Sequence, residues 1–303
     1  MLGKDFYRSS FPESLFTAKK PRKFSKYVIK GYDRCSTLNV VICGLCRDIE
    51  NALPSTIARI ERTRSFFRKS KVIIVENDSS DSTPAILNKY QNESTGVKII
   101  NPTIKDKTKY DNKDSVSGMS FGRMSLMSTL RNVYLDELHD YKDFDYVIMV
   151  DMDLDGGWSY EGLLSCFSFK EWSAMGANGL LFKQEEVIKG GVVLPSKVKR
   201  IFYDTWAFRE VGQKKFKGYA IHEFLQLDKG EKPVLVDSVF SGLGVYRMKD
   251  CLRCEYRPFT KTEEVACEHV SFNEQIRKGG NKIYINPSMI TLYSPTEYSQ
   301  HDT

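Results

Sequence analysis

An α/β fold with a mostly parallel central sheet flanked by helices is the fold class that this sequence predicts. Short apolar runs recur along the first half of the chain, and segments with helical spacing lie between them. Strand, helix, strand, helix and strand follow one another within residues 37–100. Such an alternation implies right-handed crossovers and therefore parallel strands.

Three runs are predicted to be buried parallel strands: 37–43, 71–76 and 97–100. Between the first two runs, apolar residues recur at helical spacing over 51–68, and Pro54 suits a first helical turn. A turn-rich stretch with helix-capping residues then leads into a second helix that starts at Pro84.

The pattern continues after a polar stretch, 103–118, which is predicted to be a long loop. A helix is predicted over 119–138 and a strand over 146–150. Beyond residue 160 the signals are weaker. Strand-like runs and a short helix are predicted there in this order: 179–182, 200–203, 234–240, 244–246 and 271–278.

Composition places the chain among globular proteins. With 303 residues and 41% hydrophobic residues, it is neither disordered, collagen-like nor a coiled coil, and it suits one large domain or two small ones. Its 45 Lys and Arg against 39 Asp and Glu lack the basic density of a dedicated nucleic-acid binder. The balance is compatible with an anionic small ligand or with transient contact at an anionic membrane surface.

No segment of the sequence resembles a membrane span or a signal peptide. The longest apolar run, 40–46, is far shorter than the ~20 residues that cross a bilayer. The N-terminus has no apolar core of a signal sequence. We therefore expect a soluble, cytoplasmic protein of a reducing compartment.

Residues 1–36 form a polar, basic N-terminal arm in this interpretation, with cations clustered around Pro21. We expect a solvated arm that packs on the domain edge or extends from it. Contact with a membrane surface or a partner is the alternative.

The seven cysteines are predicted to be buried or incidental thiols. Cys43 and Cys46 have the Cys-x-x-Cys spacing of redox sites, but no thioredoxin-like helix pattern follows them. Cys251 and Cys254 have no partner pair at zinc-site spacing. Redox chemistry and a zinc site remain the alternatives.

The strongest candidate for chemistry is an acidic cluster at the end of a strand. The apolar run 146–150 passes directly into Asp151, Asp153 and Asp155. In open α/β sheets, ligands bind outside the carboxyl ends of strands. Adjacent carboxylates there repel one another unless a cation intervenes, and oxygen ligands suit Mg²⁺ or Mn²⁺. In an extended chain these three side chains point the same way. A capped strand-to-helix turn is the alternative.

A second polar cluster follows the strand 71–76. Acids and hydroxyls run from Glu76 through Asp78 to Thr83, and they could accept hydrogen bonds from a nucleobase or ribose. The alternative is a well-capped loop before a helix, which uses the same residue types.

Three of these segments together resemble the nucleotide-sugar glycosyltransferases of the glycosyltransferase-A fold. They are the first strand and its loop, 41–48, the loop 76–83, and the Asp-x-Asp at 151–153. Further motifs at 202–209, 241–246 and 267–269 are similar to the fungal capsule-associated mannosyltransferase family and to related bacterial and large-virus proteins. The resemblance implies a single glycosyltransferase domain over 37–303, with a nucleotide-binding half, 37–160, and an acceptor-binding half, 161–303.

By this resemblance the chain is a metal-dependent glycosyltransferase. A nucleotide-sugar donor, linked to UDP or GDP, would transfer its sugar to a glycan acceptor with Mn²⁺ or Mg²⁺ as cofactor. Asp153 would bind the metal, Asp151 the ribose or metal, and Asp155 either; His269 or His301 could add a ligand. The residues implied in nucleotide binding are Cys43, Gly44, Arg47, Glu76, Asp78, Arg123, Arg131 and Asp151.

Arg123 and Arg131 share a broad face of the predicted helix 119–138. They could meet the diphosphate or close on the Asp cluster, and surface ion pairing is the alternative.

Glu268 is the preferred candidate for the base that an inverting enzyme needs, with Asp237 and Asp204 as rivals. A retaining enzyme would need no base at this position. The residues implied in sugar contacts are Gly242, Gly244, Trp158, Trp206, Tyr203 and Arg209, with core packing as an equal alternative for the aromatic ones.

Two other classes of function stay open from sequence. A nucleotidyltransferase would use the same metal and phosphates, but the first strand lacks the Gly-rich, basic loop of that class. A non-catalytic nucleotide- or glycan-binding module would keep the site without turnover.

Overall fold

The structure is a computed structural model that describes residues 11–104, 120–189, 192–218 and 221–293. Side chains are described for these ranges except 183–199 and 222–223. The predicted loop 103–118 lies almost entirely outside the described residues, as does His301.

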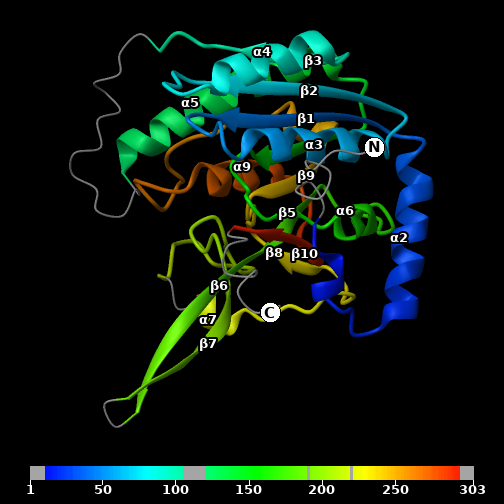
Figure 1. Ribbon diagram of the computed structural model, residues 1–303. Coiled ribbons are helices and arrows are strands. Elements are labelled where there is room, and N and C mark those ends of the chain that lie inside the picture. Colours follow the sequence, from blue (N-terminus) through cyan, green and yellow to red (C-terminus); the bar gives the residue numbers. More distant parts are fainter. Residues whose placement is uncertain (1–10, 105–119, 190–191, 219–220, 294–303) are drawn as a thin grey trace.

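The N-terminal half of the sheet is parallel, as the sequence predicts. The strands lie in the order β3, β2, β1, β4, and every neighbouring pair among them is parallel. Their bounds are β1 (Asn39–Cys46), β2 (Lys69–Glu76), β3 (Val97–Ile100) and β4 (Tyr146–Asp151). The connecting helices are α3 (Leu53–Arg64), α4 (Thr83–Glu93) and α5 (Phe121–Glu137). All seven correspond to predicted elements, so the α/β fold with helices flanking a central sheet is confirmed (Figure 1).

Alternating side chains of β1 fill the cores on the two faces of this sheet. Val40 and Ile42 belong to the core that includes Leu53 of α3, whereas Val41 and Cys43 belong to the core that includes Tyr134 of α5. The period of two in a strand therefore buries β1 on both sides. This explains why its sequence is a continuous apolar run.

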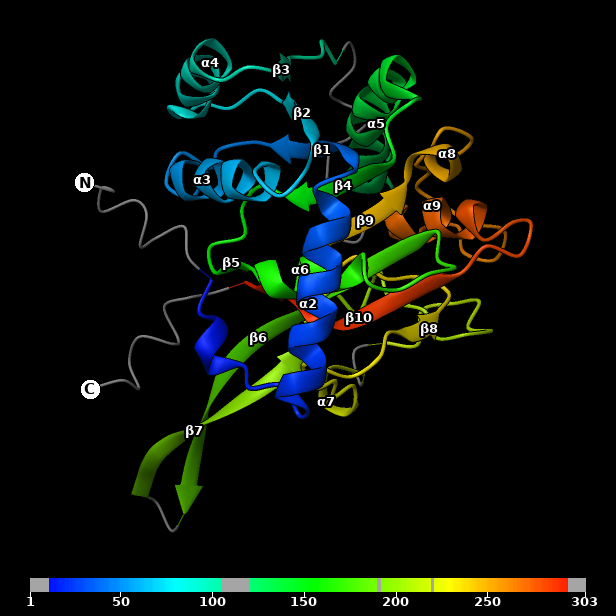
Figure 2. The same cartoon turned by 90° about the vertical axis from the view of Figure 1, so that its right-hand side faces the viewer.

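The C-terminal half of the sheet mixes directions. Strand β9 (Leu243–Arg247) pairs antiparallel with β4, and the sheet continues through β6 (Ala174–Lys189), β10 (Ile283–Leu292) and β5 (Gly157–Trp158). β6 and β7 (Val192–Phe202) form a long antiparallel hairpin that extends away from the body (Figures 1 and 2). β8 (Val234–Val236) pairs with β10.

Strand β10 is an element that the sequence pattern missed. Its apolar run is interrupted by Asn286, Pro287 and Ser288, which are typical of turns. The strand tolerates them because its pairing with β6 shifts register between Ile285 and Ile290.

Apart from α2 (Pro21–Cys35), which is described below, the remaining helices are short. They are the 3₁₀ helices η1 (Glu13–Leu15) and η3 (Leu138–Tyr141) and the α-helices α6 (Tyr160–Cys166), α7 (Ile221–Phe224), α8 (Met248–Cys251) and α9 (Glu268–Ile276). Helix α9 corresponds to the predicted helix 271–278 but starts three residues earlier, at Glu268. No helix in the described ranges is long and apolar enough to cross a bilayer.

The basic N-terminal segment contains a helix that the sequence pattern did not predict. Helix α2 (Pro21–Cys35) buries Phe24, Gly31 and Cys35. It packs against α6, and a Cβ at Gly31 would lie 1.8 Å from the Leu164 carbonyl oxygen, so a side chain there has no room. The segment therefore packs on the domain edge as a helix rather than as a solvated chain.

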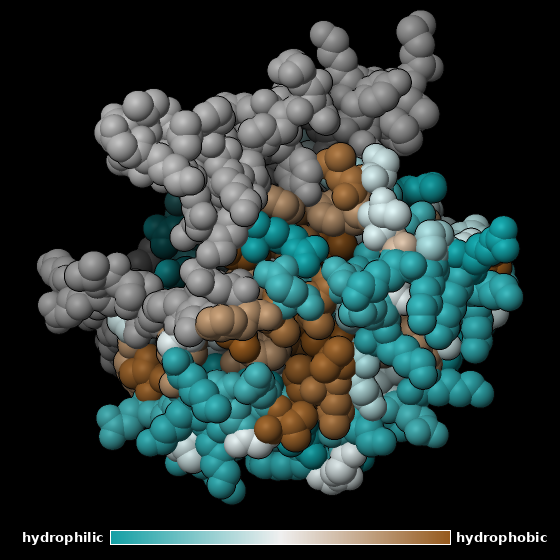
Figure 3. Space-filling model, turned by 90° about the horizontal axis from the view of Figure 1, so that it is seen from below, coloured by the Kyte–Doolittle hydropathy of each residue, from teal (hydrophilic) through white to brown (hydrophobic). Residues whose placement is uncertain are grey.

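One face of the molecule also carries apolar surface. Seen from below, apolar side chains form a patch within a hydrophilic surround (Figure 3). Exposed apolar residues on elements of the C-terminal half include Phe224 of α7 and Leu235 of β8.

Candidate active site

The site lies where β4 ends. Asp151 is the last residue of β4, and its backbone N–H donates to the Gly242 carbonyl 2.9 Å away. The chain turns directly after it, at residues 152–153 and again at 155–156. The prediction that Asp151, Asp153 and Asp155 alternate along an extended strand is therefore wrong. Asp153 and Asp155 are exposed, and the Asp155 carbonyl oxygen accepts a hydrogen bond from Arg59.

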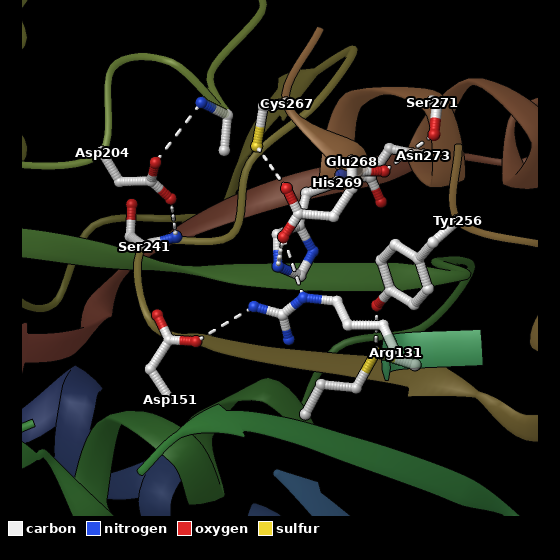
Figure 4. A network of polar contacts seen from close by, with 12 residues as sticks. Arg131, Asp151, Asp204, Ser241, Tyr256, Cys267, Glu268, His269, Ser271 and Asn273 are labelled. Atoms are coloured by element: carbon white, nitrogen blue, oxygen red, sulfur yellow. Dashed lines mark hydrogen bonds and ion pairs between the residues drawn. The ribbon is translucent and has the colours of Figure 1, made fainter. Parts of the chain in front are cut away.

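Arg131 of α5 is the centre of the site (Figure 4). Its Nε lies 2.8 Å from Glu268 Oε1, and its Nη2 lies 3.2 Å from Asp151 Oδ1. The guanidinium also lies against the Phe240 and Tyr256 rings, with centroids 5.3 and 5.7 Å away. Arg131 thus contacts Asp151 of the predicted Asp cluster, and its side chain is buried rather than on the surface.

Both carboxylate oxygens of Glu268 contact neighbouring side chains. The residue lies in the first turn of α9 and is buried. Its Oε1 faces Arg131, and its Oε2 accepts a contact of 3.6 Å from Cys267 Sγ. An acid held this way is a partner for Arg131 more than a free proton acceptor.

Asp204 is a half-buried carboxylate on the opposite side of the site (Figure 4). Its oxygens accept hydrogen bonds from the backbone N–H of Ser241, at 2.8 Å, and of Ala207, at 3.3 Å. Burial raises the pKa of Asp204 to about 7, and the negative charges of Asp151 and Glu268 add to that rise. Its backbone φ of 66° lies in the left-handed region, which Asp and Asn adopt more readily than most residues other than glycine.

Electrostatic coupling shows which groups share this space. Burial raises the pKa of Asp151 to about 6, Arg131 opposes the rise, and Asp153 and Glu268 add to it. Burial likewise raises the pKa of Tyr203 to about 12; Asp204, Asp151 and Asp153 add to the rise, and Arg123 opposes it. The three aspartates, Tyr203 and Arg123 are therefore within electrostatic reach of one another.

His269 lies beside the network but away from solvent. Its ring stacks on Phe240 with centroids 3.6 Å apart, and neither ring nitrogen has a described hydrogen-bond partner. Burial, with the charge of Arg131, holds the pKa of His269 well below its usual range, so the imidazole is neutral. Among the described residues no three His, Cys, Asp or Glu side chains could together hold a metal ion.

The loops after β1 and β2 are tied together. Ser80 N donates to Asp48 Oδ1 at 2.7 Å, and Asp48 N donates to Ser79 Oγ at 2.9 Å. Buried Glu76 accepts from the Ser79 N–H at 2.7 Å. Most of this polar cluster thus forms hydrogen bonds within and between these loops, as expected for the alternative of a well-capped loop before a helix. Of the residues predicted to bind the nucleotide here, Arg47 and Asp78 are exposed, as are Asp48 and Ser80 beside them.

Several predicted site residues belong to the core instead. Cys43 is fully buried, and Cys46 lies in the core of the opposite face, so the pair cannot act together in redox chemistry or zinc binding. Burial raises the pKa of the Cys46 thiol to about 12. A Cβ at Gly44 would lie 2.6 Å from Met152 Sδ. The absence of a side chain at Gly44 therefore makes room for the Met152 side chain.

Trp158 and Arg209 are structural for the same reason. The Trp158 ring is buried, and its Nε1 donates to Thr63 Oγ1 at 3.1 Å. Arg209 pairs with Glu263 at 2.8 Å and donates to the carbonyls of Trp206 and Phe208. Neither side chain presents a surface to a sugar. Trp206 is partly buried against the core, whereas Tyr203 remains exposed at the site.

The two glycines differ in role. Gly242 has φ 78°, and a Cβ there would lie 2.5 Å from the Tyr293 hydroxyl, beside Asp151. Gly244 lies inside β9, where a Cβ would meet the Tyr246 ring at 2.6 Å. Of the two, only Gly242 borders the acidic site.

Asp237 lies apart from the acidic site. Its carboxylate pairs with Arg277 at 2.6 Å and accepts the Gly212 N–H at 3.0 Å. It lines a separate cavity of about 400 Å³, whose lining includes none of Asp151, Asp153, Asp204 or Glu268.

Tyr293 and Ser241 are site residues that sequence reasoning missed. The Tyr293 ring lies tilted against the Tyr203 ring with centroids 3.6 Å apart. Burial raises the pKa of the Tyr293 hydroxyl, and the charges of Asp151, Asp204 and Asp153 add to that rise. Ser241 also has a left-handed φ, 55°. The Ser241-Gly242 pair, which is typical of a tight turn, was the sequence signal that could have indicated Ser241.

Comparison with known proteins identifies the family. The family model described as Cryptococcal mannosyltransferase 1 matches residues 39–275. The chain belongs to this family. The predicted membership of the capsule-associated mannosyltransferase family is therefore confirmed. No curated protein sequence gives a match.

Solved structures of glycosyltransferases are similar to the chain at low identity. GalNAc-T7 with UDP, GalNAc and Mn²⁺ is 12% identical with a TM-score of 0.48, and the match covers 85% of this chain and 44% of that one. The mannosyltransferase PcManGT from Pyrobaculum calidifontis, with GDP-Man and Mn²⁺, is 10% identical with a TM-score of 0.48, covering 89% and 64%. TarS 1–349 of S. aureus is 14% identical with a TM-score of 0.44, covering 87% and 63%. The chain thus spans less than two thirds of these proteins.

Proposed function

We propose that the chain is a metal-dependent transferase that moves a sugar from a UDP- or GDP-linked donor to a glycan acceptor, with mannose as the sugar that its family favours. The observation that carries the proposal is the contact of Arg131 with Asp151 at the end of β4, with exposed Asp153 two residues away. This arrangement holds a carboxylate pair open at a sheet edge where ligands bind.

The carboxylates fit a divalent cation. Burial is the main cause of the raised pKa of Asp151, and the charge of Asp153 adds to it, so the two carboxylates repel each other and a cation relieves that repulsion. Mg²⁺ is commonly held by one or two carboxylates together with substrate phosphates. Asp151 and Asp153 would hold Mn²⁺ or Mg²⁺ in this way, and the ion would neutralise charge on the departing diphosphate. His269 faces Phe240 and contributes little to such a site.

The chain's own residues have separate roles around the donor. Arg131 fixes the Asp151 carboxylate, and Tyr134 accepts a further bond of 3.3 Å from its Nη1. Arg123 is exposed and acts electrostatically on Tyr203, so it can face the diphosphate. Arg47 and Asp78 are exposed on the loops after β1 and β2, where they can face the nucleotide.

Asp204 is the base in this proposal. Its pKa of about 7 suits proton transfer near neutral pH, whereas Glu268 is paired with Arg131 and Asp237 with Arg277. The acceptor hydroxyl oxygen forms the new bond to the anomeric carbon as the bond from that carbon to the diphosphate oxygen breaks. The hydroxyl proton goes to Asp204, and the product has inverted anomeric configuration.

The metal role is tested by Asp153→Ala. We expect loss of Mn²⁺-dependent release of nucleoside diphosphate from a panel of UDP- and GDP-sugars, because the exposed ligand is removed. Asp155→Ala, in the next turn of the same loop, is the matched control and should retain turnover. Equal turnover in wild type and Asp153→Ala would sink the metal assignment.

The base is tested by Asp204→Asn. Asparagine keeps an oxygen for the Ser241 N–H and tolerates a left-handed φ, so the loop should persist. We expect transfer to fall about 10²- to 10⁴-fold. Asp237→Asn serves as the control. A product of retained configuration, or an equal loss in Asp237→Asn, would contradict this role.

The alternative functions have no observation in their favour. Membership of a glycosyltransferase family argues against a nucleotidyltransferase and against a module without catalysis.

A further inference from the structure

Helix α2 carries a basic face that no described residue neutralises. Its exposed side includes Arg22, Lys26 and Lys30, with Lys20 just before the helix. None of these four forms an ion pair or side-chain hydrogen bond with any other described residue. Asp33 is the acidic residue of the helix, so the face has a strong excess of positive charge.

The spacing places these cations on one side of the helix. Arg22, Lys26, Ile29 and Asp33 follow at intervals of three and four residues, so they form one stripe. Phe24, Gly31 and Cys35 lie on the other side and are buried. Helix α2 lies on the outside of the molecule (Figure 2), and because its opposite side is buried, its basic side is exposed.

Two large apolar side chains interrupt the same exposed side. Ile29 is 59% exposed and Tyr32 is 50% exposed. Tyr32 adjoins Phe66, with centroids 6.2 Å apart, and exposed Arg62 lies 5.2 Å over the Phe66 ring. The basic and apolar character thus continues from α2 onto the end of α3.

We propose that this face of α2 docks the protein on an anionic lipid bilayer. Surface cations lie at the height of phosphate headgroups, and Ile29 and Tyr32 insert among them, as aromatic and aliphatic residues do at membrane interfaces. Charge complementarity selects an anionic surface, and the exposed apolar residues favour a lipid interface over an acidic protein. The proposal is independent of the reaction that the enzyme catalyses.

The size of the expected effect follows from the number of charges. A Lys or Arg near an anionic leaflet strengthens partitioning about fivefold. Loss of three cations should therefore weaken it about a hundredfold. The attraction should also fall as salt rises, since screening acts over about 8 Å at physiological ionic strength.

The experiment is co-sedimentation of the full chain with vesicles of phosphatidylcholine alone or mixed with an equal amount of phosphatidylserine. Wild type should bind the anionic vesicles and be released by salt. The variant Arg22→Gln, Lys26→Gln, Lys30→Gln should lose this binding, since glutamine preserves helix propensity. The control variant Lys89→Gln, Lys142→Gln, Lys249→Gln removes the same charge from other exposed positions and should bind like wild type.

Three results would overturn the proposal. Wild type that stays in solution with anionic vesicles would assign the face to another partner, such as an acidic protein. Equal binding to both vesicle types would remove the electrostatic basis. Equal weakening in the two triple variants would trace binding to net charge rather than to α2. Matching thermal unfolding of the variants shows that each one is folded.

Discussion

Arg131 is buried between two carboxylates, which makes it the most sensitive single residue of the site. Its removal would leave Glu268 and Asp151 without their cation in a largely buried setting. Breaking a buried ion pair by deleting one partner costs about 3–5 kcal/mol. We expect Arg131→Met to lower the free energy of unfolding by about this amount. Urea unfolding measures it.

Glu268→Gln is the matched control for that prediction. It removes one charge but retains an oxygen that can accept from Arg131 Nε. Its loss of stability should be clearly smaller than that of Arg131→Met. A larger loss would show that the buried carboxylate, not the guanidinium, organises the network.

Asp204 predicts how stability depends on pH. Its folded-state pKa is about 7, above the value of about 4 in an unfolded chain. Between these values the folded state binds the extra proton, so this contribution is full below about pH 4 and is lost as pH rises through about 7. Asp204→Asn lacks the ionisation. The loss of unfolding free energy from about pH 5 to about pH 8 should be larger in wild type than in Asp204→Asn, and identical slopes would refute the assignment.

At the scale of elements, β1 and the turn after β4 fit together through Gly44. An added Cβ would meet the Met152 Sδ and Cγ at 2.6 and 2.7 Å. We expect Gly44→Ala to cost about 1–3 kcal/mol from overpacking. In a Met152→Ala background those atoms are absent, so the cost should shrink. A double-mutant cycle of unfolding free energies measures the coupling, and strict additivity would contradict this packing.

The elements themselves follow closely from sequence patterns where packing is local. The strands β1, β2 and β4 are apolar runs because both of their faces are covered, and α3 and α4 start at prolines in their first turns. Helix α2 was not predicted because Lys and Arg residues dominate its sequence. Its buried stripe is narrow and includes a glycine.

At the scale of the whole molecule, Lys229 connects the N-terminal segment to the body. This buried lysine lies 2.7 Å from both Glu13 and Glu161, and 5.1 Å over the Phe24 ring. It thus joins η1, α2 and α6. We expect Lys229→Met to increase amide hydrogen exchange in residues 11–35 about tenfold or more, while β1 to β4 remain protected.

Lys19→Met is the control for the contacts of Lys229. Lys19 is exposed, and its pairs with Asp228 and Glu231 are surface pairs of little energetic weight. Exchange in residues 11–35 should change little in that variant. Unchanged exchange in Lys229→Met would show that the helix contacts of α2 suffice.

The sequence by itself determined the parallel α/β core, the family and the position of the Asp-x-Asp at the end of β4. Those features are local, since they depend on strand and helix periodicity and on residues adjacent in the chain. Tertiary structure decided which candidates act together. Arg131, Asp151, Asp204 and Glu268 come from separate segments, and only packing brings Asp151 and Glu268 to the Arg131 guanidinium and Asp204 within electrostatic reach of both carboxylates. Packing also removed Cys43, Trp158 and Arg209 from the site, because burial depends on contacts between distant segments that no local pattern records.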